Sequence, residues 1–156
     1  MELIIQKAVE LGASRIVPVA TKRSVVKLDD KKAQAKISRW QGIAEAAAKQ
    51  SKRDVIPQIG ALMTLKEALK EAAEFDVSIM PYENAEDMAA TRGLLEGIRP
   101  GQRVAVFIGP ECGFDDGEVE AALSQGTKPV TLGRRILRTE TAGLAVLAML
   151  VYVLEA

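Results

Sequence analysis

Short apolar segments alternate along this chain with longer segments of helical periodicity, and this alternation limits the folds open to it. The apolar segments are rich in β-branched residues and end in turn-forming residues, which predicts strands. The five predicted strands span residues 15–20, 54–59, 76–83, 103–109 and 128–133. The predicted helices span residues 2–11, 30–51, 65–73, 85–95, 115–126 and 140–155. Strands that alternate with helices predict an α/β fold, with a parallel sheet and helices on both faces.

Local signals at the ends of these segments support the assignment. Pro57 predicts that strand 54–59 lies at an edge or ends early, because proline cannot donate to a ladder. Strand 103–109 is apolar throughout and is expected to be fully buried. Glu67, three residues after a threonine, is typical of a capping box. The predicted N-caps are Asp29 or Asp30, Thr64 and Thr139.

The chain of 156 residues has the length of one domain. Its 21 basic and 21 acidic residues cancel, which argues against a protein that holds nucleic acid by charge alone. No apolar run reaches the roughly 20 residues that span a bilayer, and the longest, 142–154, predicts a core helix. Gln6, Lys7 and Glu10 interrupt the first apolar stretch, so no secretory signal is expected.

The rarity of cysteine and the lack of histidine exclude several kinds of chemistry. One cysteine cannot form an internal disulfide or a CxxC site, and it fits a reducing cytosol. Without histidine, Ser-His and Cys-His catalysis and His-ligated zinc are excluded, and no metal site is expected. Proton transfer would have to use other titratable side chains or the substrate itself.

The stretch FIGPECGFDDG, residues 107–117, joins a predicted strand to a predicted helix. Gly109 and Gly113 allow positive φ or a close backbone approach. The stretch is open to three interpretations: a tight turn, an anion site at a helix N-terminus, or a nucleophilic Cys112. Two aspartates already stand where an anion would bind, and no histidine can activate the thiol, so a turn is favoured.

A second stretch, LGRRILRTETA at residues 132–142, places three arginines around the apolar pair Ile136 and Leu137. A solvated charged loop would not need that pair. The pattern fits either a pocket wall with cations at its rim or a loop held by a small core of its own. Glu140 fits the first turn of a helix, where an acid complements the helix dipole.

The segments IGPECGFDDGEVEAA (108–122) and VTLGRRILRTETAGLA (130–145) resemble the RsmE-type 16S ribosomal RNA uridine-N3 methyltransferases of the SPOUT superfamily. That family typically shows GPEGG followed by LG-x-R-I-L-R-T-E-T-A. Residues 4–27 and 39–59 are also similar to family segments, so the resemblance covers nearly the whole chain. Cys112 departs from the pattern, because relatives commonly have glycine there. A side chain at a positive φ would cost on the order of 1 kcal/mol.

The resemblance implies a SPOUT fold with a deep trefoil knot at its C-terminal end, S-adenosylmethionine as methyl donor, and a homodimer formed through the knot region. It implies 16S rRNA or the small ribosomal subunit as substrate, and a cytoplasmic protein. Residues 1–156 would be the catalytic domain, without the PUA-like N-terminal RNA-binding domain of the family. The helix that starts at Met1 without an N-cap fits either the cut edge of a longer protein or a frayed terminus.

The family motif also implies a cofactor site, and the chemistry of the transfer, without histidine, leads to a hypothesis about the catalytic residues. Glu111 is expected to act as the base that removes the N3 proton of uracil, and Arg138, with Arg23 as a second candidate, to stabilise the resulting anion. The expected cofactor-binding residues are Met80, Pro81, Tyr82, Ile108, Gly109, Glu111, Gly113, Leu132, Gly133, Ile136, Leu137 and Arg138.

Further cations could contact RNA phosphate, although a solvated helix face explains the last four equally well: Lys22, Arg23, Lys27, Lys31, Lys32, Lys36 and Arg39. Glu45, Gln50 and Arg53 match another family stretch and could face RNA or a partner subunit, or simply serve the helix end. Two alternatives stay open. One is a dimeric S-adenosylmethionine- or nucleotide-binding module that is inactive without its RNA-binding domain. The other is methylation of another RNA atom.

Overall fold

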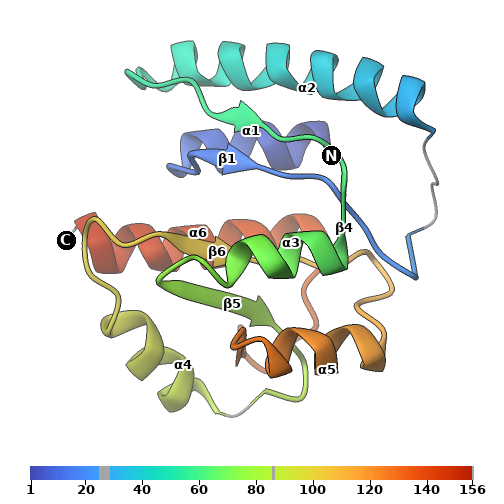
Figure 1. Ribbon diagram of the computed structural model, residues 1–156. Coiled ribbons are helices and arrows are strands. Elements are labelled where there is room, and N and C mark those ends of the chain that lie inside the picture. Colours follow the sequence, from blue (N-terminus) through green and yellow to red (C-terminus); the bar gives the residue numbers. More distant parts are fainter. Residues whose placement is uncertain (25–28, 86, 156) are drawn as a thin grey trace.

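The computed structural model describes residues 1–24, 29–85 and 87–155, in which helices and short strands alternate (Figure 1). The helices are α1 (Glu2–Glu10), α2 (Asp30–Gln50), α3 (Leu65–Ala72), α4 (Met88–Glu96), α5 (Asp116–Ser124) and α6 (Thr139–Glu155). The strands are β1 (Arg15–Ile16), β2 (Val19–Ala20), β3 (Gln58–Ile59), β4 (Met63–Thr64), β5 (Val77–Pro81), β6 (Val104–Val106) and β7 (Lys128–Val130). Within these ranges, no helix combines the length and apolar character that a membrane crossing requires.

Every strand pair in the described residues is parallel. β1 pairs with β3, β2 pairs with β4, and β5 lies between β6 and β7 in a three-stranded sheet. In that sheet Val77 lies opposite Val104, and Met80 lies opposite Pro129. The predicted parallel α/β class is therefore confirmed, although the strands form three separate small ladders.

The predicted strand 15–20 is in fact two strands with different partners. Ile16 O accepts from Gly60 N at 2.8 Å, whereas Pro18 O accepts from Met63 N at 3.1 Å. Pro18 has no N–H to donate, so the ladder is interrupted there and resumes with another strand. That second partner, β4, is too short to show a period in the sequence.

Two other strand predictions need correction. Segment 54–59 pairs only over Gln58–Ile59, so Pro57 precedes the strand, although the edge position predicted from Pro57 is confirmed because, among the described strands, β3 pairs with β1 alone. Strand 103–109 was expected to be fully buried, but Val104–Val106 are half-buried. The reason is that β6 pairs with β5 alone and forms an edge of its sheet.

The two faces of β5 contribute to two different cores. Met80 packs with Leu69 of α3 and Val119 of α5. Its neighbour Ile79 packs with residues of α4, β7 and α6, among them Val146. Successive side chains of a strand point to opposite faces, so helices cover both faces of this sheet as predicted.

A third core lies between α1 and α2, where Ile5 and Trp40 are buried together. Arg53, just beyond α2, closes this unit. Its Nη1 donates to Val9 O at 3.1 Å and to Ala13 O at 2.6 Å, at the C-terminal end of α1. A cation is favourable at the negative end of a helix dipole. Arg53 thus stabilises a neighbouring helix end.

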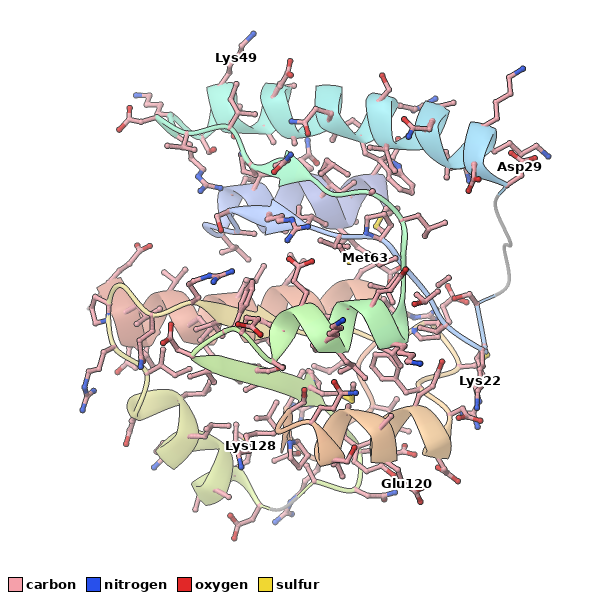
Figure 2. The ribbon with its side chains drawn as sticks, in the orientation of Figure 1. Lys22, Asp29, Lys49, Met63, Glu120 and Lys128 are labelled. Carbon is pink, nitrogen blue, oxygen red and sulfur yellow. The ribbon has the colours of Figure 1, made fainter. Side chains whose placement is uncertain are left out.

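Side chains that accept backbone N–H groups begin several helices. Asp29, at the start of α2 in Figure 2, accepts from the N–H of Lys32 at 2.8 Å. Thr64 and Glu67 form the predicted reciprocal capping box of α3. Both caps depend only on neighbours within one helical turn, so the sequence could predict them.

Candidate functional site

The loops that follow β5, β6 and β7 come together at the carboxyl ends of the sheet (Figure 1). Tyr82 N donates to Val130 O at 3.0 Å, which anchors the start of the first loop to the end of β7, from which the third loop departs. Thr139 Oγ1 donates to Gly109 O at 3.0 Å, which joins the third and second. The prediction of Thr139 as the N-cap of α6 is wrong, because α6 already begins at Thr139. Its hydroxyl binds across the site instead.

Residues 107–115 form the loop between β6 and α5, and glycine is needed at its two glycine positions for different reasons. At Gly109, an added Cβ would lie 3.1 Å from two ring carbons of Phe114. At Gly113, φ is +72° and the N–H donates to Pro110 O at 2.8 Å. The first glycine permits a close approach and the second a left-handed turn.

Cys112 lies in this loop without backbone strain. Among the described residues, Lys52 alone combines a side chain with a positive φ. Cys112 is exposed, and its carbonyl accepts a hydrogen bond from Arg23. The left-handed residue of the motif is Gly113, so a side chain is tolerated at position 112.

The residues expected to bind a cofactor differ in burial. Met80 is only 1% exposed, and its side chain belongs to the core beneath β5. The half-buried residues are Pro81, Tyr82, Ile108, Gly109, Leu132 and Leu137. The exposed residues are Glu111, Gly113, Gly133, Ile136 and Arg138.

Residues 131–138 form the loop between β7 and α6. Gly133 has φ +110°, and Leu132 packs against the core of β5 and α6. Leu137 is half-buried, whereas Ile136 is 88% exposed. Of the apolar pair, Leu137 thus packs partly against the protein, whereas Ile136 points to solvent. Ile136 can wall a pocket only if a ligand or a second molecule covers it.

A cleft of about 450 Å³ adjoins these loops. Glu111, Cys112 and Arg23 line it, together with Thr139 and Glu140 of α6. It therefore brings together two of the three predicted catalytic side chains. Glu140 had been assigned to the helix dipole alone, and a half-buried carboxylate at this cleft could not be read from its position in the sequence.

Arg23 also holds the 107–115 loop directly. Its Nη1 donates to Cys112 O at 3.0 Å and to Phe114 O at 3.3 Å. The adjacent Lys22 Nζ lies 3.3 Å from Asp115 Oδ1. These two cations, expected to contact RNA, therefore contact the site loop in the structure.

The other predicted phosphate contacts are dispersed. Lys31, Lys32, Lys36 and Arg39 lie on α2 and are exposed, while Lys27 lies outside the described residues. Arg39 pairs with Glu2 of α1. Glu45 and Gln50 are exposed on the same helix. Both a solvated face and an RNA contact remain compatible with this helix.

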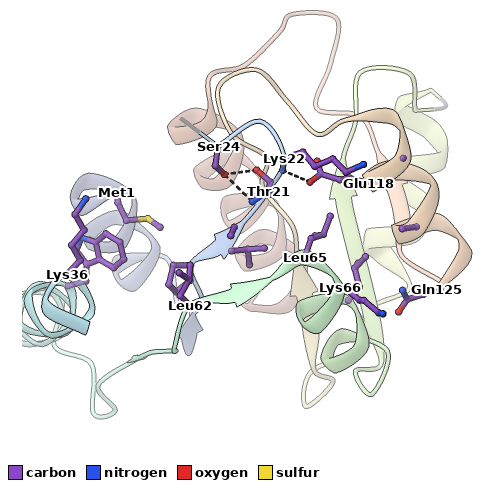
Figure 3. Close-up of a pocket in the computed structure, with 17 residues that line it drawn as sticks. Met1, Thr21, Lys22, Ser24, Lys36, Leu62, Leu65, Lys66, Glu118 and Gln125 are labelled. Carbon is purple, nitrogen blue, oxygen red and sulfur yellow. Dashed lines mark hydrogen bonds between the residues drawn. The ribbon is translucent and has the colours of Figure 1, made fainter. Parts of the chain in front are cut away.

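A larger cleft of about 1000 Å³, which the sequence did not reveal, lies between α2 and the pair α3 and α5 (Figure 3). Its apolar lining includes Trp40, Leu62 and Leu65, and Lys36 and Lys66 also line it. Among the described residues that line it, none belongs to the three loops. Glu118 connects this larger cleft to the 107–115 loop, because it lines the cleft and accepts a hydrogen bond from Asp115 N.

Asp115, the N-cap of α5, stays ionised under ordinary conditions. The backbone N–H of Glu118 donates to it and holds its pKa below the usual value, with a further contribution from Lys22. A hydrogen bond to the charged form favours that form. The start of α5 therefore carries a fixed negative charge, which supports the expectation that this helix end does not bind phosphate.

Fold and site together define a class: parallel α/β domains whose ligand site is built from backbone-rich loops beyond the carboxyl ends of the strands. Within that class, the RNA methyltransferase domain family matches residues 1–151. The match spans most of the chain, and the chain belongs to this family.

Several relatives agree with this assignment. The Ribosomal RNA small subunit methyltransferase E of Bacillus subtilis (strain 168) is 39% identical over 158 residues, which cover 99% of this chain and 62% of that protein. Its namesake from Mesomycoplasma hyopneumoniae (strain 232) is 38% identical over 146 residues, 94% of this chain and 61% of that protein. The chain therefore spans less than two thirds of the length of these relatives.

A solved structure shows the same fold. The crystal structure of a Ribosomal RNA small subunit methyltransferase E from Neisseria gonorrhoeae, bound to S-adenosyl methionine, matches with a TM-score of 0.86 at 33% identity. The match covers 99% of this chain and 61% of that one.

Proposed function

We propose that this domain transfers a methyl group from S-adenosylmethionine to N3 of a uridine in the 16S rRNA of the small ribosomal subunit. The observation that carries the proposal is the convergence of three loops at the carboxyl ends of β5, β6 and β7. It is supported by the Neisseria gonorrhoeae relative, which shares this fold and binds S-adenosyl methionine. A ribosomal substrate would place the protein in the cytoplasm.

The residues of the three loops fit such a methyl donor. Gly109 lets the Phe114 ring pack against the backbone, and Gly113 permits a left-handed turn, so the 107–115 loop is compact. Backbone groups of such a loop can read an adenine ring. The half-buried side chains of Tyr82, Leu132 and Leu137 add apolar surface. The holding residues would be Met80, Pro81, Tyr82, Ile108, Gly109, Glu111, Gly113, Leu132, Gly133, Ile136, Leu137 and Arg138.

Bound S-adenosylmethionine would supply an electrophilic methyl group and leave as S-adenosylhomocysteine, and the protein must make N3 of the uracil nucleophilic. A neutral uracil N3 carries a proton and is a weak nucleophile. We assign removal of that proton to the carboxylate of Glu111, which lines the smaller cleft. The developing charge on uracil O2 or O4 requires a cation, and the candidates are Arg138 and Arg23.

The structure supports the two arginines in different ways. Arg23 shares the cleft with Glu111, and its guanidinium is already fixed on the carbonyls of the 107–115 loop. Arg138 is exposed on the loop before α6, and its carbonyl accepts from Ala142 N at 2.8 Å. Arg138 could therefore turn its side chain toward a base that enters from solvent.

We also propose the finer features of the family fold: a trefoil knot formed by the 131–138 loop and α6, and a homodimer through that region. The contact between Thr139 and Gly109 supports the knot. The dimer is supported by the apolar surface of α6, on which Tyr152 is 78% exposed. Residues 1–156 would constitute the catalytic domain.

Two measurements test the activity. Calorimetry with S-adenosylmethionine tests the pocket, and incorporation of labelled methyl groups into small ribosomal subunits tests the transfer. Binding with transfer is expected. Binding without transfer would favour a nucleotide-binding module, and an absence of binding would contradict the proposed function.

A further inference from the structure

Residues 21–24 form a tight turn directly after β2, which we call the 21–24 turn. Ser24 N donates to Thr21 O at 3.2 Å, and Thr21 N donates to Ser24 Oγ at 3.1 Å. The two hydroxyls are 2.7 Å apart. The turn is therefore closed by its own hydrogen bonds and can act as one body.

Three contacts dock this turn on the site. Lys22 N donates to Glu118 Oε1 at 2.8 Å, a bond drawn in Figure 3. Arg23 donates to two carbonyls of the 107–115 loop, and Lys22 Nζ pairs with Asp115. The paired residues are 89 to 96 residues apart in sequence. These contacts are therefore tertiary and are not required to form the turn.

Glu118 is the buried member of this set, at 6% exposure. Its Oε1 accepts from Lys22 N, and its Oε2 accepts from Asp115 N at 3.0 Å. One carboxylate thus satisfies backbone donors of both the 21–24 turn and the start of α5. A buried carboxylate that loses a hydrogen-bond donor is destabilised, so the burial of Glu118 favours the docked turn.

Glu67 offers a direct comparison within the same chain. It completes the capping box of α3, as Glu118 does for α5. However, Glu67 is exposed, and its Oε2 accepts from the N–H and hydroxyl of Thr64 alone among the described residues. The helix cap therefore does not explain why Glu118 is buried against a second segment.

We propose that Glu118 is a positioning residue for methyl transfer: it holds the 21–24 turn against the 107–115 loop, orders that loop for the methyl donor and fixes Arg23 beside the acceptor base. The inference rests on the proposed function of the site. Because both segments share the contacts, donor binding and docking of the turn should favour one another.

The test compares Glu118→Gln with Glu67→Gln. In each variant the glutamine oxygen can still complete the capping box. At position 118, however, the new NH₂ group must face Lys22 N–H, so two donors meet where a donor and an acceptor met. The first variant therefore removes the docking bond, and the second is a control for the loss of charge in a capping box.

The first readout needs no ligand. Amide hydrogen exchange of Gly113, whose N–H donates to Pro110 O, reports the order of the 107–115 loop without touching Glu118. We expect Glu118→Gln to speed this exchange about tenfold, as the loss of a hydrogen bond to a charged group implies. Glu67→Gln should leave it unchanged. Equal exchange in both variants would overturn the inference.

The second readout is calorimetric binding of S-adenosylmethionine. We expect Glu118→Gln to raise Kd roughly fivefold to tenfold, and Glu67→Gln to change it less than about twofold. Because Glu118 acts through Arg23, Arg23→Ala combined with Glu118→Gln should bind no more weakly than the weaker single variant. Additive losses would overturn the proposed route through Arg23.

Two further outcomes are informative. If Glu118→Gln does not fold, Arg23→Ala alone tests the docking, because it leaves the buried carboxylate intact and should still speed Gly113 exchange. Unchanged exchange would then overturn the inference. If the wild-type domain binds no S-adenosylmethionine, the proposed function fails, while a selective rise of Gly113 exchange in Glu118→Gln would still support the docking.

Discussion

Glu111 and Arg23 lie far apart in the chain, yet they line one cleft beside the 107–115 loop. A carboxylate and a guanidinium at such a place can move a proton and stabilise the charge that it leaves behind. Without histidine in the chain, these side chain types are the ones available for that work. The proposed catalytic roles can therefore be tested by substitution of single residues.

Glu111→Gln removes the proposed base and leaves the size of the side chain nearly unchanged. We expect the single-turnover rate at saturating methyl donor to fall about 100-fold or more, the usual contribution of a general base. Glu120→Gln, an exposed neighbour on α5, is the control (Figure 2). A full rate in Glu111→Gln would exclude Glu111 as the base.

Cys112→Gly restores the residue common in relatives. Because φ at Cys112 is not positive, the thiol residue carries no strain that glycine could relieve. We expect the free energy of unfolding to fall by about 0.5–1 kcal/mol through the added freedom of the unfolded chain. Affinity for S-adenosylmethionine should stay the same in calorimetry. A large loss of affinity would reveal a contact made by the thiol.

At the scale of elements, α5 connects the site to the rest of the domain through its first turn. Its capping box is a local pattern, and Asp115 or Asp116 was recognisable in the sequence as its start. The second bond of Glu118 was not recognisable, because Lys22 lies 96 residues away. Local hydrogen bonding could be predicted, whereas contacts between distant loops required the structure.

The same distinction explains the strands. The parallel α/β arrangement, with helices on both faces of the sheet, could be predicted from periodicity. The change of partner at Pro18 could not, because it depends on where β3 and β4 lie. The short length of β4 also hid it from any periodic signal. For the site, the motifs placed the three loops, and the structure added Glu140 and showed that Ile136 is exposed.

The lowered pKa of Asp115 gives α5 a dependence on pH. Folding lowers that pKa below its ordinary 3.8, mainly through the N–H of Glu118. The carboxylate therefore stabilises the fold above pH 3.8, and the stabilisation is lost as the pH falls through the lower folded pKa. In urea unfolding, wild type should lose more stability than Asp115→Asn over this acidic window. Parallel losses would contradict this role.

At the scale of the whole molecule, α6 presents an apolar surface that the domain itself covers only in part. Within the described residues, only Val146 and Leu150 of this 17-residue helix are buried. Tyr152 is exposed on this helix, and the other large apolar residues that it does not bury are half-buried. A contiguous apolar surface of this kind is typical of an interface between proteins. The proposed homodimer would cover this face with a second copy of the chain.

Tyr152→Asp tests that interface, because it places a charge on the exposed face of α6. We expect the dissociation constant of the dimer to rise at least about tenfold in sedimentation equilibrium, since aromatic residues often dominate interfaces. Lys49→Asp, on α2 in Figure 2, is the matched surface control and should not alter assembly. A monomeric wild type, or an equally stable Tyr152→Asp dimer, would contradict the proposal.

The central claim is the transfer of a methyl group to N3 of a uridine, and mass-spectrometric mapping of the modified nucleoside tests it most directly. Small ribosomal subunits that lack the modification would be incubated with the protein and S-adenosylmethionine, and their RNA digested to nucleosides. The account predicts N3-methyluridine at one position of the 16S rRNA. A methyl group on another base atom or on a ribose, or no methyl group at all, would contradict it.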